Sequence, residues 1–196
     1  IQHDPDSLSR LGGWLFRHRS SLPLPLVAVL LLVPAPSTGL GAWPGWLVAG
    51  MPVVLAGELL RLWGVHHIGV ISRTRSDRLG PLIDSGPFAV VRNPLYLGNI
   101  MLWLGFSLSA GLLWLAPVVV GLLALEYHAI VRWEERLLES RIGESYRQYM
   151  ARVPRWIPRL SAGQPLRYDP AFSWTDTLFS ERGTLIAIVA GYALLL

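Results

Sequence analysis

The sequence predicts an all-α integral membrane protein whose chain crosses the bilayer about five times. Of its 196 residues, 52% are hydrophobic and only 15% are charged, which is too apolar for an ordinary water-soluble domain. The mean hydropathy of +0.42 indicates the same class. The apolar residues also lie in long uncharged runs, and such runs span a bilayer as helices. The class is therefore a polytopic helical membrane protein.

Five apolar runs are the expected spans. The third is short for a hydrocarbon core about 30 Å thick. The fifth ends while the chain is still apolar, so either the chain continues or this segment dips in without crossing. We favour an incomplete last span in a chain truncated at both ends. The five runs cover residues 22–42, 43–65, 95–110, 112–131 and 183–196.

The distribution of arginine predicts the topology. All 17 basic residues are arginine, and all of them except Arg61 lie before the first run, in 66–93 or in 132–182. The turns at 37–41 and 107–111 carry no charge. Because cytoplasmic loops are the ones enriched in basic residues, we expect the N-terminus and both arginine-rich segments in the cytoplasm, with the protein in the cell inner membrane. The net charge of +4 then reflects topology, and no nucleic-acid partner is expected.

The first polar segment, 77–99, is rich in glycine and proline, which predicts an ordered loop. At its end, Asn93 and Pro94 fit the N-cap and the first position of the third span. A helix N-terminus beside Arg92 can bind an anion. Equally, Asn93 and Pro94 can simply cap a helix while Arg92 faces lipid phosphates.

The second polar segment, 126–159, continues as a helix out of the fourth run. Its adjacent carboxylates Glu134 and Glu135 point about 100° apart, so only one of them can face a given ligand. The other can pair with Arg132 or Arg136, and a solvated charged face fits the same pattern.

Other chemistry is restricted by composition. The absence of cysteine excludes disulfides and thiolate metal sites, and the spacing around His66 and His67 offers no third ligand, so no metal is expected. Glu58 and Arg61, three residues apart in the second run, can pair on one helix face as a functional or a structural pair.

The motifs together resemble the isoprenylcysteine carboxyl methyltransferase family, which is similar to the phospholipid N-methyltransferases. They are LIDSGPFAVVRNPLYLGN, an apolar hairpin, and EERLLESRIGESYRQYMARVPRWIPR. The resemblance implies a single membrane methyltransferase-like domain over 1–196, with a cytoplasmic cofactor region at about 73–159 and a cytoplasmic linker at 160–182. It also implies S-adenosylmethionine as cofactor and a lipid or isoprenoid-like acceptor drawn from the bilayer.

Carried over position by position, the resemblance implies a cofactor-binding set and a catalytic set. Arg92 or Arg132 would hold an anionic acceptor, since the position of the family's substrate-contacting arginine is Ile130 here. Asn93 stands where the family usually has histidine, and an amide hydrogen-bonds but cannot exchange a proton near neutral pH. The catalytic set is Arg92, Asn93 and Arg132. The cofactor-binding set is Gly80, Pro81, Leu82, Ile83, Phe88, Asn93, Pro94, Leu95, Tyr96, Glu134 and Glu135.

The acceptor expected on these grounds is a carboxylate. A carboxylate is already ionised and needs no base, so alignment can supply most of the rate, whereas an amine would have to lose a proton. The alternatives are a phospholipid N-methyltransferase, an NADPH-dependent sterol-type reductase and a non-catalytic membrane subunit.

Overall fold

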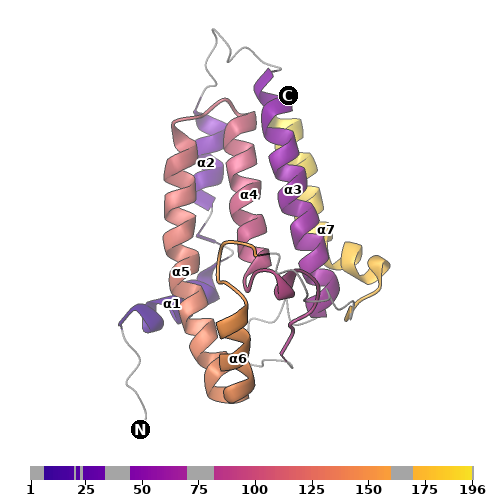
Figure 1. Ribbon diagram of the computed structural model, residues 1–196. Coiled ribbons are helices and arrows are strands. Elements are labelled where there is room, and N and C mark those ends of the chain that lie inside the picture. Colours follow the sequence, from indigo (N-terminus) through magenta and orange to yellow (C-terminus); the bar gives the residue numbers. More distant parts are fainter. Residues whose placement is uncertain are drawn as a thin grey trace.

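The computed structural model describes residues 7–19, 21–22, 24–33, 45–69, 82–159 and 170–195. Within these ranges the chain forms seven α-helices, one short 3₁₀ helix and no strand, which confirms the predicted all-α class (Figure 1). In chain order they are α1 (Ser7–His18), α2 (Leu24–Leu32), α3 (Gly45–Ile68), η3 (Gly86–Ala89), α4 (Pro94–Ser109), α5 (Leu115–Ile142), α6 (Glu144–Arg152) and α7 (Trp174–Leu195).

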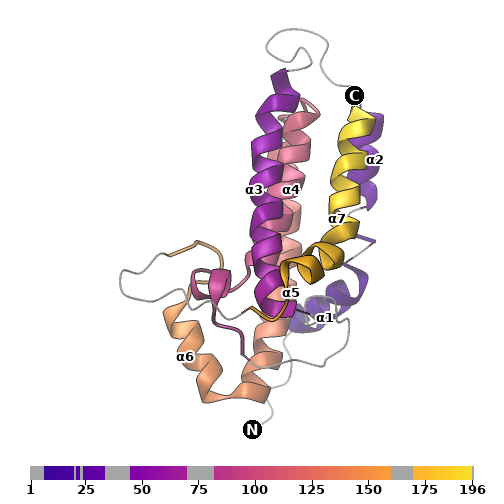
Figure 2. The same ribbon diagram turned by 90° about the vertical axis from the view of Figure 1, so that its right-hand side faces the viewer.

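Five of the helices, α2, α3, α4, α5 and α7, run along a common direction, whereas α1 lies across one end of the bundle and α6 folds back beneath the same end (Figures 1 and 2). Three helices, α3, α5 and α7, are long and apolar enough to cross a membrane. The α4 helix has 16 residues, and α2 has nine, with residues 34–44 outside the described ranges. Three of the five expected spans are thus confirmed as candidates in a polytopic membrane protein.

The last helix begins earlier than the sequence prediction placed it. Residues 174–182, expected in a linker, form the first turns of α7, and the helix reaches 22 residues instead of the short run from 183. The cause is a capping box: the backbone N–H of Asp176 donates to Ser173 Oγ at 3.1 Å, and Ser173 N–H donates to Asp176 Oδ2 at 3.3 Å. The helix therefore begins within the segment that was predicted as a linker.

The α3 and α4 helices approach closely because glycines line their contact. A Cβ atom added at Gly57 would lie only 2.8 Å from the carbonyl oxygen of Gly98, and one added at Gly105 would lie 2.7 Å from the backbone nitrogen of Val54. Small residues allow helix backbones to pack closely in membranes, where apolar surfaces alone give little drive for association. This contact fixes the start of α4 relative to α3.

Candidate active site

Most of the described residues that were singled out in the sequence lie at the end of the bundle where α4 begins. They lie on η3, on the first turn of α4 and on the C-terminal half of α5, and they are covered by α6 and the turn at 153–159 (Figure 1). Gly80 and Pro81 lie outside the described residues. Leu82 and Ile83 are partly buried.

The helix start predicted from Asn93 and Pro94 is confirmed: Asn93 occupies the N-cap position and Pro94 the first position of α4. The Asn93 side chain does not cap the helix, however. Its Nδ2 donates to the carbonyl oxygen of Arg155 at 3.2 Å, and the backbone N–H of Arg92 donates to Pro154 O at 2.9 Å. The amide therefore ties the turn at 153–159 to the start of α4.

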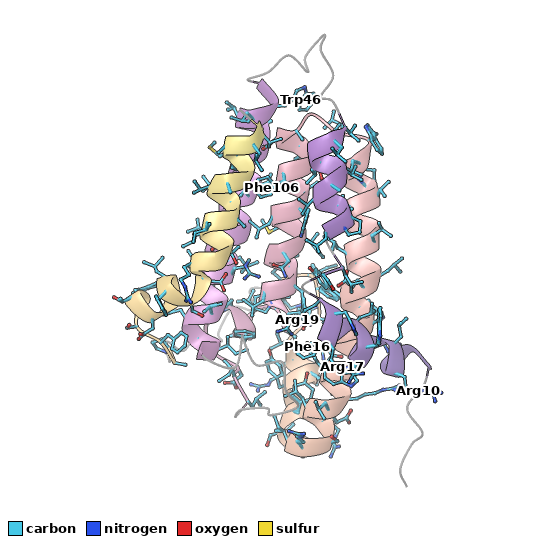
Figure 3. The ribbon with its side chains drawn as sticks, turned by 180° about the vertical axis from the view of Figure 1, so that it is seen from behind. Arg10, Phe16, Arg17, Arg19, Trp46 and Phe106 are labelled. Atoms are coloured by element: carbon cyan, nitrogen blue, oxygen red, sulfur yellow. The ribbon has the colours of Figure 1, made fainter. Side chains whose placement is uncertain are left out.

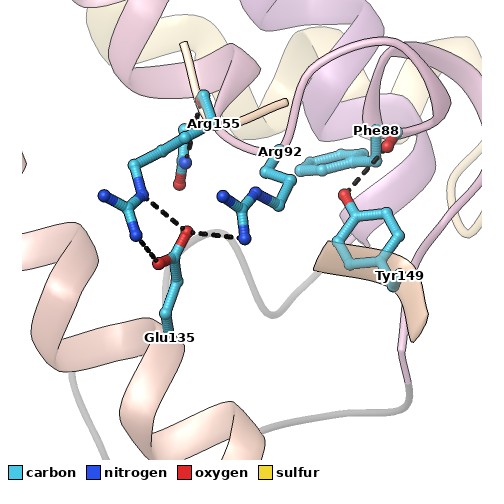
Figure 4. A network of polar contacts seen from close by, with 6 residues as sticks. Phe88, Arg92, Glu135, Tyr149 and Arg155 are labelled. Atoms are coloured by element: carbon cyan, nitrogen blue, oxygen red, sulfur yellow. Dashed lines mark hydrogen bonds and ion pairs between the residues drawn. The ribbon is translucent and has the colours of Figure 1, made fainter. Parts of the chain in front are cut away.

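Glu135 is fully engaged by two arginines (Figure 4). Arg155 binds it with both ends of the guanidinium, Nε to Oε1 at 3.1 Å and Nη2 to Oε2 at 2.6 Å, and Arg92 Nη1 lies 3.3 Å from Oε1. Bidentate pairs of this kind are among the strongest side-chain contacts. Because Glu135 is only 7% exposed, it serves here to hold the chain around the site.

A second anchor joins η3 to α6. The Tyr149 hydroxyl donates to the carbonyl oxygen of Phe88 at 2.8 Å (Figure 4). Burial raises the pKa of the Tyr149 phenol well above its usual range, so it stays protonated and keeps this donor at neutral pH. Tyr149, Tyr146 and Val153 form a small apolar cluster on which Leu82 packs. These contacts hold residues 82–93 of the loop against α6.

Glu134 is placed differently from its neighbour. The Tyr96 hydroxyl donates to Glu134 Oε1 at 3.1 Å, and the Tyr96 ring packs against Tyr127 with 4.8 Å between centroids. A carboxylate has about four acceptor positions, and Tyr96 fills one of them. Glu134 can therefore accept further hydrogen bonds from a ligand.

A polar cavity of about 270 Å³ lies on another face of α5. Arg132 lines it, and because successive helical residues are about 100° apart, Arg132 points roughly 160° away from Glu134. The structure thus separates Arg132 from the Tyr96–Glu134 pair, although both were singled out in the sequence. The cavity is lined by Arg132, Glu135, Arg136, Glu139, Met150 and Arg155.

Two features of this end of the bundle were not predicted as parts of the site. Arg19 follows α1, and its Cζ lies 4.0 Å from the ring centroid of Phe16, which in turn packs on Trp133 at 5.0 Å. Arg19 is within electrostatic range of Tyr96 and Glu134. The sequence analysis used Arg19 only to predict the topology, because no local sequence signal shows that α1 packs on α5.

The other feature extends the expected Glu58–Arg61 pair, which is present at 3.7 Å. Arg61 makes its shorter contacts elsewhere, donating from Nη2 to Glu181 Oε2 on α7 at 2.6 Å and from Nη1 to Asn99 on α4. This network connects three helices close to the site.

Comparison with known proteins gives the family. The phospholipid methyltransferase family model matches residues 46–145, about half of the chain. The cobalt-zinc-cadmium resistance protein CzcN of Cupriavidus metallidurans is 33% identical over 176 residues, 87% of this chain and 76% of that protein. The nickel-cobalt-cadmium resistance protein NccN of Alcaligenes xylosoxydans xylosoxydans is 31% identical, over 78% and 70% of the two chains. The phosphatidyl-N-methylethanolamine N-methyltransferase of Saccharomyces cerevisiae is 30% identical over 51% of this chain and 50% of its own.

Among the described residues, no three or more histidine, aspartate or glutamate side chains gather so that they could hold a metal ion.

Proposed function

The chain belongs to the phospholipid methyltransferase family, and from this premise we propose that it is an S-adenosylmethionine-dependent methyltransferase acting on a lipid-like acceptor. The observation that carries the proposal is that the two adjacent carboxylates have different partners. Glu135 is occupied by Arg92 and Arg155, whereas Glu134 receives one hydrogen bond from Tyr96 and keeps acceptor capacity.

The donors and acceptors at this end of the bundle fit that cofactor. S-adenosylmethionine supplies a methyl group bonded to a positively charged sulfur. Glu134 would accept hydrogen bonds from its ammonium group or ribose hydroxyls, a role for an ionised carboxylate. The remaining proposed cofactor contacts come from the loop before α4 and from its first turn: Gly80, Pro81, Leu82, Ile83, Phe88, Asn93, Pro94, Leu95 and Tyr96, with Glu135 beside Glu134.

The chain would contribute to catalysis by aligning the acceptor with the methyl group of the cofactor and by excluding water from the site. Tyr127 is 4% exposed and packs against Tyr96, so the Glu134 side of the site is lined by aromatic rings. Holding two reactants in line in such an environment can contribute about 7–11 kcal/mol to lowering a barrier. Asn93 holds Arg155 O instead of exchanging protons, so the proposed chemistry needs a nucleophile that is already ionised.

We propose a carboxylate as the acceptor for that reason, as in isoprenylcysteine-type O-methylation. The second candidate is N-methylation of a phospholipid amine, which the yeast relative favours. Either acceptor would enter from the bilayer between the helices.

The proposed orientation places this end of the bundle in the cytoplasm, in the inner membrane of the cell. Its support is the segregation of charge: Arg10, Arg17 and Arg19 lie at the end that carries the site, whereas Trp46 lies at the opposite end (Figure 3). Cytoplasmic segments are the ones enriched in arginine.

The test is calorimetric titration of S-adenosylhomocysteine into the detergent-purified protein, in the wild type, Glu134→Ala and Glu144→Ala. We expect binding in the micromolar range that Glu134→Ala weakens about tenfold or more, because a hydrogen bond to a charged group is lost. The matched control, Glu144→Ala, removes an exposed carboxylate paired with Arg147 on α6, and it should bind as the wild type does. A folded wild type that binds no S-adenosylhomocysteine but binds NADPH would replace the proposal with the reductase alternative.

A further inference from the structure

The acceptor site lacks an assigned cation once the arginines are placed in three dimensions. Arg92 is ion-paired with Glu135, and its side chain is only 11% exposed. Arg132 lines the polar cavity on the α6 side of α5, about 160° from Glu134 around the helix. An anionic acceptor head beside Tyr96 would therefore meet neither arginine and would need another cationic partner.

Arg19 lies on the correct side. Its guanidinium sits over the ring of Phe16, and Phe16 shares one buried cluster with Tyr127 and Ile130, on which Tyr96 also packs. Positions 127 and 130 fall on the same face of α5 as Glu134, because residues four and seven apart overlie one another on a helix. Arg19 is also only partly buried, so a ligand can reach it.

The surroundings of Arg19 suit a ligand with an apolar chain. Arg19 stands where α1 ends and α2 follows, and Leu26, Val29 and Leu30 of α2 pack against the same buried hydrophobic cluster. Figure 3 shows Arg19 beside the bundle, whereas Arg10 lies at its outer margin. An acyl or prenyl chain lying along α2 would bring its head group to the level of Arg19.

We propose that Arg19 binds the negatively charged group of a ligand at this site, in the first place the carboxylate or phosphate head of the acceptor. The inference rests on the proposed function and adds a binding residue to it. The negatively charged group could instead be the carboxylate of the cofactor, so the experiment distinguishes the acceptor from the cofactor as its source.

The experiment measures two affinities in the purified full chain. Bromododecanoate, a fatty acid whose bromine quenches tryptophan fluorescence, reports a chain bound near the tryptophans of the bundle, among them Trp103 and Trp133. Bromododecanol is its uncharged counterpart. Calorimetry with S-adenosylhomocysteine reports the cofactor side. The variants are Arg19→Gln, the charge-conserving Arg19→Lys, and Arg17→Gln, which removes an exposed arginine two residues earlier, in α1.

We expect Arg19→Gln to weaken bromododecanoate about tenfold or more, with a smaller loss in Arg19→Lys and none in Arg17→Gln. The alcohol should bind all four proteins alike, and S-adenosylhomocysteine should be unaffected. If S-adenosylhomocysteine weakens instead and bromododecanoate does not, anion binding by Arg19 stands and its source is the cofactor. Unchanged affinities for both probes in Arg19→Gln would overturn the inference. An absence of S-adenosylhomocysteine binding in the wild type would instead concern the proposed function, since the fatty-acid result is read independently.

Discussion

Glu134 and Glu135, neighbours in the chain, have separate tasks because a helix turns them about 100° apart. One faces Tyr96, and the other faces two guanidiniums from η3–α4 and from the turn after α6. Removing Glu135 would leave buried positive charge without its partner, which is more costly than losing a surface pair. The sequence showed that the two carboxylates must differ, but not that Arg155 would be the partner of Glu135.

Asn93 is expected to act through its amide donor. Asn93→Ala removes the hydrogen bond to Arg155 O and leaves that carbonyl without its donor, which costs about 1–2 kcal/mol. The thermal midpoint of the detergent-solubilised protein should fall by about 3–6 °C, since about 1 kcal/mol corresponds to roughly 3 °C at this size. Asn93→His keeps a ring N–H donor and should stay close to the wild type. Equal midpoints for wild type and Asn93→Ala would show that the amide contributes nothing to the wall of the site.

Among the elements, the α3–α4 contact depends most on small residues. Gly57→Ala places a Cβ 2.8 Å from the backbone oxygen of Gly98, so the two helices must separate. Gly121→Ala is the matched control, since nothing lies within 4 Å of its added Cβ on α5. We expect Gly57→Ala to lower the thermal midpoint, and Gly121→Ala to leave it unchanged or raise it, because alanine favours a helix over glycine by about 1 kcal/mol. Thermal unfolding followed by circular dichroism checks this; a destabilised Gly121→Ala with a stable Gly57→Ala would contradict it.

The elements that local signals define were predictable, and those set by distant contacts were not. Asn93 and Pro94 correctly marked the start of α4. The start of α7 was missed because Asp176 and Glu181 looked like linker residues, whereas Asp176 closes a capping box and Glu181 is paired with Arg61 across to α3. For the same reason the docking of α1 on α5 left no mark on the sequence.

At the scale of the whole molecule, the sequence predicted the class, three of the candidate spans and the gathering of polar residues at one end. It did not predict which arginine would lie where. Arg92, Arg132 and Arg19 end in three different surroundings, with Glu135, with the polar cavity and with an aromatic cluster. The spacing of the motifs predicts that these residues lie in the same region. Which side of the helix each residue faces, and hence what it contacts, depends on how the helices pack.

The proposed orientation gives a prediction for the intact membrane. The sequence contains no cysteine, so single cysteines can be placed without background labelling. Ser145→Cys, on the exposed side of α6, should react with an impermeant maleimide only after the cytoplasmic face is opened. Leu113→Cys, in the exposed turn between α4 and α5, should react from outside in intact cells. The opposite labelling pattern would invert the topology.

The length of α4 has a consequence for how a substrate could be delivered. Its 16 residues span about 24 Å, less than the roughly 30 Å of hydrocarbon, so a helix starting at Pro94 can begin below the level of the head groups. A lipid would then present its head to Tyr96 and Glu134 while its tail stayed dissolved in the bilayer. Extracting a sixteen-carbon chain into water would cost on the order of 12 kcal/mol, at about 0.8 kcal/mol for each methylene. A recessed site removes this desorption step from the turnover cycle, and lateral diffusion replaces it as the route of supply.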